Sequence, residues 1–220
     1  MRISFLALGA VLLSTVNAAA DCTSEVNDAF AKLRKSTAFN MQTTIVNEQG
    51  KLTMSNDYVM PDRMHQRVSL SVQGPKTMEM ILIGDKAWSN HGEGWAPLPP
   101  QFAQEVAKQM KETVAEPPKD ASSYECLGDV EFEGKTYAAY RAARPAKKED
   151  KKADKAEDEA EGENKTAAAA DTPNVQTVYI DKETGLPARN IVTPKQDPKK
   201  RLFDGTFSLR DGLTIDPPKS

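Results

Sequence analysis

The chain has 220 residues, of which 29 are Lys or Arg and 32 are Asp or Glu, and its formal net charge is −3. This length suits one domain with a hydrophobic core, and the slightly acidic balance leaves no basic stripe for nucleic acid. After the first 20 residues, no stretch is apolar enough to cross a bilayer, which takes about 20 apolar residues. Composition therefore predicts a single domain that neither binds nucleic acid nor spans a membrane.

The first 20 residues have the layout of a cleavable secretory signal of the short bacterial type. Arg2 precedes an apolar run over residues 3–13, and the segment ends in three alanines, the small side chains that a signal peptidase requires. We expect residues 1–20 to be removed, the mature chain to begin near Asp21, and the protein to reside in the periplasm. Acylation of Cys22 is an alternative, although Asp21 stands where a lipid-anchor motif has a small neutral residue.

Cys22 and Cys126 are the two cysteines of the chain. Export places them in an oxidising compartment, where a cysteine pair is more often a structural bridge than a redox site. We therefore predict a disulfide that ties the mature N-terminus to the middle of a sheet.

The apolar spacing of the N-terminal half predicts a helix and then antiparallel strands. Residues 24–36 carry apolar side chains at three-and-four spacing, which predicts an amphipathic helix with Ser24 as its N-cap. Alternation of apolar and polar residues predicts half-buried strands over residues 51–60 and 67–72. Residues 78–83 are apolar on both faces, which predicts a central strand covered on both sides.

A Gly-rich turn between Trp88 and Trp95 leads into a second predicted helix, over about residues 101–114. Further strands are predicted over residues 123–133, 137–140, 175–181, 187–193 and 202–209. The last residues, from Asp216 onward, are expected to trail off.

Residues 145–173 form a low-complexity segment of Lys, Glu, Asp and Ala. Without aromatic or branched aliphatic side chains, the segment cannot bury enough apolar surface to offset the entropy cost of ordering. We predict a disordered, solvated insert between two strands, and a charged docking arm is the alternative interpretation.

No set of residues in the sequence points to catalysis. His65 lies in a strand pattern and His91 in a Gly-rich turn, and no serine stands in a nucleophile elbow. Gly92 and Gly94 are followed by Trp95 and prolines, whereas a phosphate-binding loop needs a helix start at that point. We therefore expect no enzyme activity, no catalytic residue and no cofactor.

Methionine is the unusual component, with eight in the chain. Met60, Met64, Met78 and Met80, with His65 nearby, could hold Cu(I) in an oxidising compartment. The same spacing is the ordinary pattern of an apolar strand face, because methionine fills irregular gaps. We expect no metal site, and copper binding stays open as an alternative.

The order of elements resembles the LolA-like family of periplasmic lipoprotein carriers and its LppX-type relatives. Three stretches carry the resemblance: residues 58–64, a strand that enters a Pro-turn; residues 80–88, an aliphatic strand, a Gly/Asp turn and an aromatic residue; and residues 178–187. The resemblance covers about residues 24–209 apart from the charged insert. The dedicated carriers have an arginine before the proline of the first motif, where this chain has Met60.

The resemblance implies an α+β fold, in which residues 21–220 form an incomplete antiparallel β-barrel, a half-barrel, with helices covering its concave face. It also implies an apolar cavity for lipid or for the acyl chains of lipoproteins. The candidate lipid-binding residues are Met54, Tyr58, Val68, Leu70, Met78, Met80, Trp88, Trp95, Phe102, Val106 and Met110.

We therefore expect a monomeric, non-catalytic carrier that contacts envelope membranes or proteins only transiently. An envelope scaffold whose interior is filled by its own side chains is a further alternative, beside the copper-binding protein.

Overall fold

The structure of the chain, a computed structural model, describes residues 18–219 except residues 49, 74–76, 119–121 and 145–173. The predicted charged insert and most of the predicted signal therefore lie outside the described residues. The elements in chain order are α1 (Ala18–Arg34), β1 (Ala38–Asn47), β2 (Gly50–Val59), β3 (Arg63–Leu70), a 3₁₀ turn η1 (Ser71–Gln73), β4 (Thr77–Ile83), β5 (Lys86–Asn90), β6 (Trp95–Pro97), α2 (Pro100–Met110), a π-helical turn η2 (Lys111–Ala115), β7 (Glu125–Phe132), β8 (Lys135–Arg144), β9 (Asn174–Asp181), β10 (Pro187–Pro194) and β11 (Phe203–Leu209).

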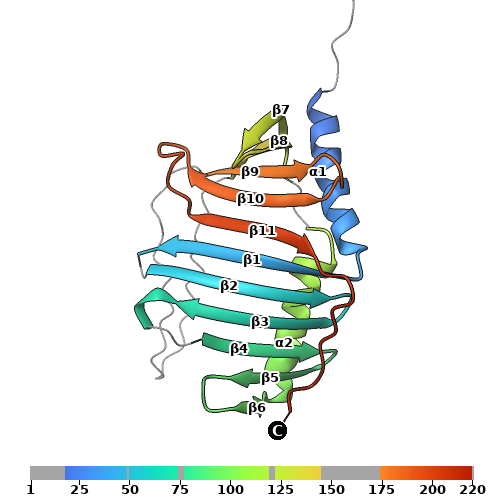
Figure 1. The fold of residues 1–220 in the computed structure, drawn as a ribbon, viewed down its shortest axis with the longest axis vertical. Coiled ribbons are helices and arrows are strands. Elements are labelled where there is room, and N and C mark those ends of the chain that lie inside the picture. Colours follow the sequence, from blue (N-terminus) through green and yellow to red (C-terminus); the bar gives the residue numbers. More distant parts are fainter. Residues whose placement is uncertain (1–17, 49, 74–76, 119–121, 145–173, 220) are drawn as a thin grey trace, which may run out of the picture.

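All the strands belong to one antiparallel sheet of 11 strands, in the order β6-β5-β4-β3-β2-β1-β11-β10-β9-β8-β7 (Figure 1). Strands β1 to β6 pair in sequence order, as do β7 to β11, and the two series are joined by pairing of β1 with β11, the last strand of the chain. The edge strands β6 and β7 do not meet, so the sheet is an open half-barrel. This architecture confirms the predicted fold class.

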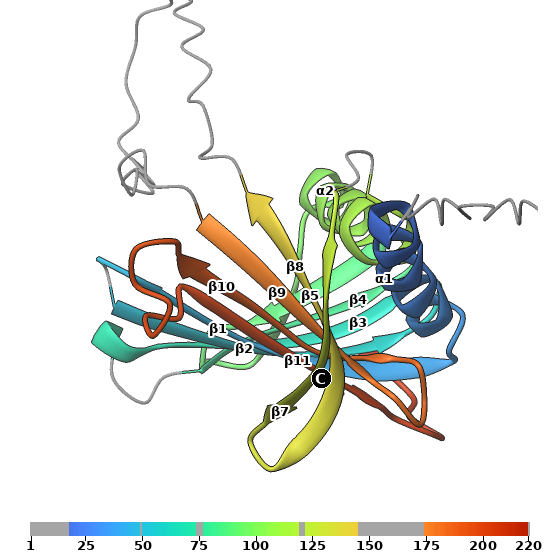
Figure 2. The same ribbon diagram turned by 90° about the horizontal axis from the view of Figure 1, so that it is seen from above.

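Both helices pack on the same face of the sheet, which we call the inner face (Figure 2). Helix α1 contacts β7, β9 and β10, whereas α2 contacts β4 and β5. The apolar side of α1 buries Val26 and Ala29 against Tyr140 and Val178. We call the side of the sheet opposite the helices the outer face.

No helix in the described part of the chain has the length and apolar character of a membrane span.

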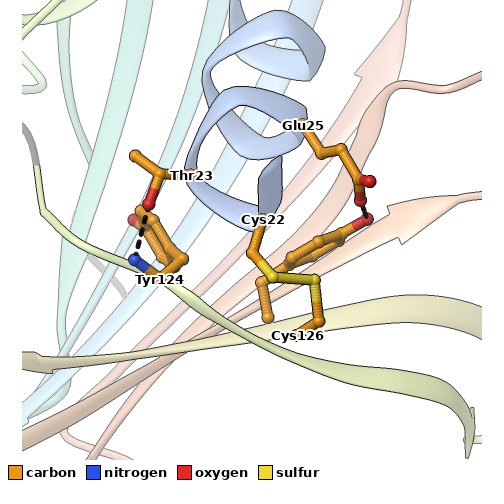
Figure 3. Close-up of a disulfide and its surroundings, with 6 residues drawn as sticks. Cys22, Thr23, Glu25, Tyr124 and Cys126 are labelled. Carbon is orange, nitrogen blue, oxygen red and sulfur yellow. Dashed lines mark hydrogen bonds between the residues drawn. A yellow bond between two sulfur atoms is a disulfide. The ribbon is translucent and has the colours of Figure 1, made fainter. Parts of the chain in front are cut away.

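A disulfide joins Cys22 in α1 to Cys126 in β7, as predicted (Figure 3). Two hydrogen bonds flank it. The backbone N–H of Tyr124 donates to Oγ1 of Thr23 over 2.9 Å, and the hydroxyl of Tyr140 donates to the Glu25 carboxylate. The bridge and these bonds fix α1 on the strands at the β7 end of the sheet.

Two predictions about the helices and strands were wrong in detail. Ser24 is not an N-cap, because α1 begins at Ala18 and Ser24 lies inside the helix. Strand β4 is not central, because it is the third strand from the β6 edge. It is covered on both sides only in part: Ile81 and Leu82, which point to opposite faces, are buried, whereas residues 78–80 are half-buried.

The segment that follows β11 packs along the sheet as far as Ile215, whereas the residues from Asp216 onward, which were expected to trail off, are mostly exposed. Ile215 is buried, and its carbonyl oxygen accepts a hydrogen bond of 2.8 Å from Nη1 of Arg63 in β3. Figure 1 shows the segment passing the ends of the strands from β1 towards β5. The segment therefore belongs to the folded domain.

Candidate functional site

Strand pairing places most of the predicted lipid-binding residues on one face. Residues directly opposite each other in antiparallel strands point to the same side of the sheet. Across β1 to β4, the inner-face rows are Phe39, Tyr58, Met64 and Leu82; Met41, Asn56, Gln66 and Met80; Thr43, Met54, Val68 and Met78; and Ile45, Leu52 and Leu70. None of these side chains carries a charge. The inner face of β1 to β4 is thus suited to apolar groups and not to charged ones.

The first of these rows lies under the helices and belongs to the protein's own core. Tyr58 and Met64 pack with Met110 and Ala103 of α2 in one buried cluster. Burial raises the pKa of Tyr58 to about 12, so its hydroxyl stays neutral at physiological pH. A cavity of about 350 Å³ remains beside this cluster, where α2 meets β4, and Met110 lines it. Tyr58 and Met110 therefore support the core more than they offer free surface.

The rows further from the helices form an apolar surface without a helix above it. We call Leu52, Met54, Val68, Leu70 and Met78 the open inner patch; all five are half-buried, and none belongs to the buried clusters. In Figure 1, α2 crosses the right-hand parts of β2 to β4. In the strand register, the patch lies two or three rows away from Tyr58, Met64 and Leu82, which pack against α2. The structure therefore brings together Met54, Val68, Leu70 and Met78 of the predicted site, with Met80 at their border.

Two buried polar atoms lie at the border between the core and the open inner patch. The side chains are those of Thr43, which is 2% exposed, and Asn56, which is 5% exposed. Neither Oγ1 of Thr43 nor Oδ1 of Asn56 has a hydrogen-bond partner among the described residues. A buried polar atom without a partner costs about 1–3 kcal/mol. The border thus holds two hydrogen-bonding atoms that the described part of the chain does not use.

The two tryptophans do not join the other predicted residues. Trp88 pairs with Ile81, which pairs with His65, so Trp88 occupies an outer-face position. The Trp95 ring lies beside the His65 ring, with 6.0 Å between centroids. Phe102, in the first turn of α2, is 59% exposed, while Val106 is half-buried against the core. The structure therefore places Trp88 and Trp95 away from the open inner patch.

The methionine and histidine groups considered for copper are separated by the sheet. Met64, Met78 and Met80 occupy inner-face positions, whereas His65 lies on the outer face. There, Nε2 of His65 is 2.8 Å from Oε2 of Glu79, and Nδ1 is 2.9 Å from Nη2 of Arg67. His65 is thus engaged in a polar network of the outer face, and the geometry does not support a mixed Met/His copper site.

A groove on the outer face was missed by the reasoning from sequence. It has a volume of about 850 Å³ and lies over outer-face positions of β8, β9 and β10, with Glu125 and Phe132 of β7 at its side. Its walls include Ala143, Tyr179 and Ile191, and three cationic side chains line it: Arg141, Lys195 and Arg201. These residues come from distant parts of the chain, so no local motif reveals them. The volume falls within the range of about 300–1,000 Å³ that is usual for small-molecule sites.

Comparisons with known proteins identify the fold. No family model matches the sequence, and no curated protein is significantly similar to it. The chain is similar in structure to LprF from Mycobacterium bovis, with a TM-score of 0.56 and 10% identity over 91% of this chain and 98% of that one. It is also similar to the lipoprotein LppX from Mycobacterium tuberculosis, with a TM-score of 0.53 and 10% identity over 90% and 99% of the two chains. A LolA superfamily protein from Nitrosomonas europaea matches at a TM-score of 0.31 with 9% identity over 89% of this chain and 95% of that one. The likeness to LprF and LppX confirms the expected LppX-like fold.

Proposed function

We propose that this protein is a non-catalytic carrier of the periplasm that binds the acyl chains of lipids or lipoproteins on the open inner patch. The observation that carries the proposal is the half-buried, uncharged row of Met54, Val68 and Met78 beyond the reach of α2. Periplasmic localisation rests on the signal-like residues 1–20 of the sequence.

The chemistry of the patch favours hydrocarbon over a polar ligand. Each methylene group removed from water contributes about 0.8 kcal/mol, so an acyl chain on this surface gains affinity with its length. Met54 and Met78 suit such a ligand, because unbranched thioether side chains can repack around chains of different length. Thr43 and Asn56, at the border, offer unused hydrogen-bonding atoms to an ester, amide or hydroxyl group near the buried end of the ligand.

Placing a charge in the patch tests the proposal directly. The variant Val68→Glu puts a carboxylate among Met54 and Met78 without touching the buried core. Because burying an ionised group against hydrocarbon is costly, we expect it to weaken binding of a fluorescent fatty acid by about tenfold or more. The matched control is Thr53→Glu, an exposed position on the outer face of β2.

Both variants should melt within a few degrees of the wild-type protein, since both positions reach solvent. Equal binding by Val68→Glu and wild type would remove the open inner patch as the binding surface. Native mass spectrometry of protein purified from its own periplasm provides the second measurement. A chain that never carries a lipid, and that does not displace the fluorescent fatty acid, would contradict the carrier proposal altogether.

A further inference from the structure

The groove on the outer face has a chemistry different from that of the open inner patch. Its floor is apolar, built from outer-face positions of three strands: Ala143, Val175 and Ile191, with Tyr179 beside them. The Tyr179 ring stacks on Phe132 of β7, with centroids 4.6 Å apart and planes 26° apart. The groove therefore has a rigid aromatic wall and an aliphatic floor, which suit the apolar body of a ligand.

The rim of the groove carries an excess of positive charge. Arg141, Lys195 and Arg201 line it, against the carboxylate of Glu125. Arg201 is also paired with Asp204 and, over 3.5 Å, with Glu133, which do not line the groove. Arg141 lies 3.4 Å from Glu125 in an exposed contact, so this pair is weak. Among the described residues, no side chain pairs with Lys195, which is exposed at the end of β10. Lys195 is thus a cation available to a ligand.

Arg201 is held in position before any ligand arrives. Its guanidinium lies over the Phe132 ring, with Cζ 5.4 Å from the centroid, and Nη1 donates to Oδ2 of Asp204 over 2.8 Å. Asp204 also accepts two hydrogen bonds of 2.7 Å from Arg189. A planar guanidinium fixed on an aromatic ring is a pre-organised partner for a carboxylate or phosphate.

We infer that this outer groove is a second binding site, selective for a single-chain amphiphile with an anionic head. The head meets Lys195, Arg141 and Arg201 at the rim, and the apolar chain lies on Ala143, Val175 and Ile191. The site is independent of the open inner patch, which is on the other face and carries no charge. The protein thus presents two apolar surfaces, one that selects for hydrocarbon alone and one that also selects for negative charge.

Three probes with the same 12-carbon chain test the charge selectivity: dodecanoate, dodecanol and dodecyltrimethylammonium, each below its micelle concentration. The protein is the full-length Val68→Glu variant, in which binding to the open inner patch is suppressed. By calorimetry, we expect one dodecanoate per chain and binding of the cationic probe that is at least about tenfold weaker, because a charge-assisted contact is worth about that factor. Equal affinity for the anionic and cationic probes would overturn the inference.

Two further substitutions, each in the Val68→Glu background, locate the site. Lys195→Glu reverses the available cation, and Ala143→Trp fills the groove from an exposed position; both should abolish dodecanoate binding. Lys199→Glu, an exposed lysine of the same loop that does not line the groove, is the matched control and should leave binding unchanged. If both groove variants bind dodecanoate like their parent, or the parent binds none, the outer site is refuted. Neither result affects binding of the fluorescent fatty acid to the open inner patch of the wild-type protein. The carrier proposal can therefore hold when the outer site is refuted.

Discussion

The hydroxyl of Thr43 is the clearest unused polar group in the structure. It is buried in the central strand β1 between Met54 and Gly205, without a hydrogen-bond partner among the described residues. Replacing such a group by an apolar isostere removes an uncompensated desolvation cost. We therefore expect Thr43→Val to increase the free energy of unfolding by about 1 kcal/mol, measured in urea.

The matched control for this prediction is Thr44→Val, the neighbouring residue on the outer face, which is half-buried. It exchanges hydroxyl for methyl in the same β-branched side chain, but this hydroxyl reaches solvent, so the stability of the protein should change by less than about 0.5 kcal/mol. A loss of stability in Thr43→Val would show that the buried hydroxyl has a partner, such as an internal water, and would remove it as a contact for the ligand.

Asp181 organises the turn between β9 and β10. Its Oδ1 accepts hydrogen bonds from the backbone N–H groups of Glu183 and Thr184, over 3.0 and 2.8 Å, and Lys135 donates to the other oxygen. The hydrogen bond from Lys135 and those from the turn lower the pKa of Asp181 to about 2. These contacts should make a pH-dependent contribution to stability.

The sign follows from the two pKa values. The unfolded carboxyl titrates near pH 3.9, so the stabilisation is complete above that pH and is lost as the pH falls towards 2. We expect the free energy of unfolding to decrease over this range, and Asp181→Asn to flatten the decrease. Asp197→Asn, in an exposed loop, should leave the decrease in place. A parallel pH profile for Asp181→Asn would contradict the role given to this carboxylate.

Residue positions were predictable from the sequence where local periodicity determines them. Alternation of apolar and polar residues places Met54, Val68 and Met78 on one face, and β2 to β4 keep that register. Periodicity does not say which part of a face a helix will cover, because that depends on packing between distant segments. Tyr58 and Met110 were therefore grouped with Val68 although they lie in the core. Trp88 and Trp95, beside a tight turn, lacked a repeat long enough to fix their face.

At the scale of elements, the disulfide fixes α1 on the sheet. Cys22 and Cys126 are 104 residues apart, so the bridge restricts a long loop of the unfolded chain. On the chain-entropy model a loop of about 100 residues is worth up to roughly 4.7 kcal/mol, and native bridges usually give about 2–5. We expect Cys22→Ala with Cys126→Ala to lower the melting temperature substantially, and a reducing agent to do the same to the wild-type protein.

The control for the disulfide prediction is the reducing agent added to the double variant, which should have no further effect. If the double variant melted like the wild-type protein, the packing of Val26 and Ala29 against the sheet, with the hydrogen bonds that flank the bridge, would suffice to hold α1.

Strands β1 and β5 were not predicted, although both lie in the sheet. β1 alternates Phe39 and Met41 with Asn40 and Gln42, and two amides on the outer face give a weak strand signal. Its central place comes from pairing with β11, whose partner residues are more than 150 positions away in the chain. Alternation of apolar and polar residues bears only on whether a segment is a strand. It does not show which distant strand the segment pairs with, so the β1–β11 pairing could not be predicted from it.

At the scale of the whole molecule, two surfaces on opposite faces are formed by one sheet. The open inner patch uses β2 to β4, and the outer groove uses β8 to β10. These strand groups lie on either side of the β1–β11 pair, which joins the two halves of the chain. Because the two surfaces lie on different strands, a substitution in the open inner patch should leave the outer groove intact, and the reverse. The binding experiments depend on this independence.

The charged residues 145–173 connect β8 to β9, and the strand pairing predicts the effect of shortening them. Arg144 and Asn174, at the two ends of the segment, are paired in the sheet, so a much shorter connection can join them. Deleting residues 147–165 leaves residues 145–146 and 166–173 as the connection. For a connection that is disordered, as the composition of this segment predicts, each halving of its length reduces the closure cost by about 0.6 kcal/mol, so the melting temperature should stay the same or rise slightly.

Ligand binding separates the two interpretations of this segment. If acyl chains bind on Met54, Val68 and Met78, the protein should bind the fluorescent fatty acid equally well with and without residues 147–165. The reason is that β2 to β4, which carry the patch, are not neighbours of β8 or β9 in the sheet. A scaffold that works through the segment should keep its fold but lose its partner in a pull-down from its own periplasm. Loss of fatty-acid binding in a deletion variant that melts normally would mean that the segment contributes to the lipid site, against the assignment of that site to the open inner patch alone.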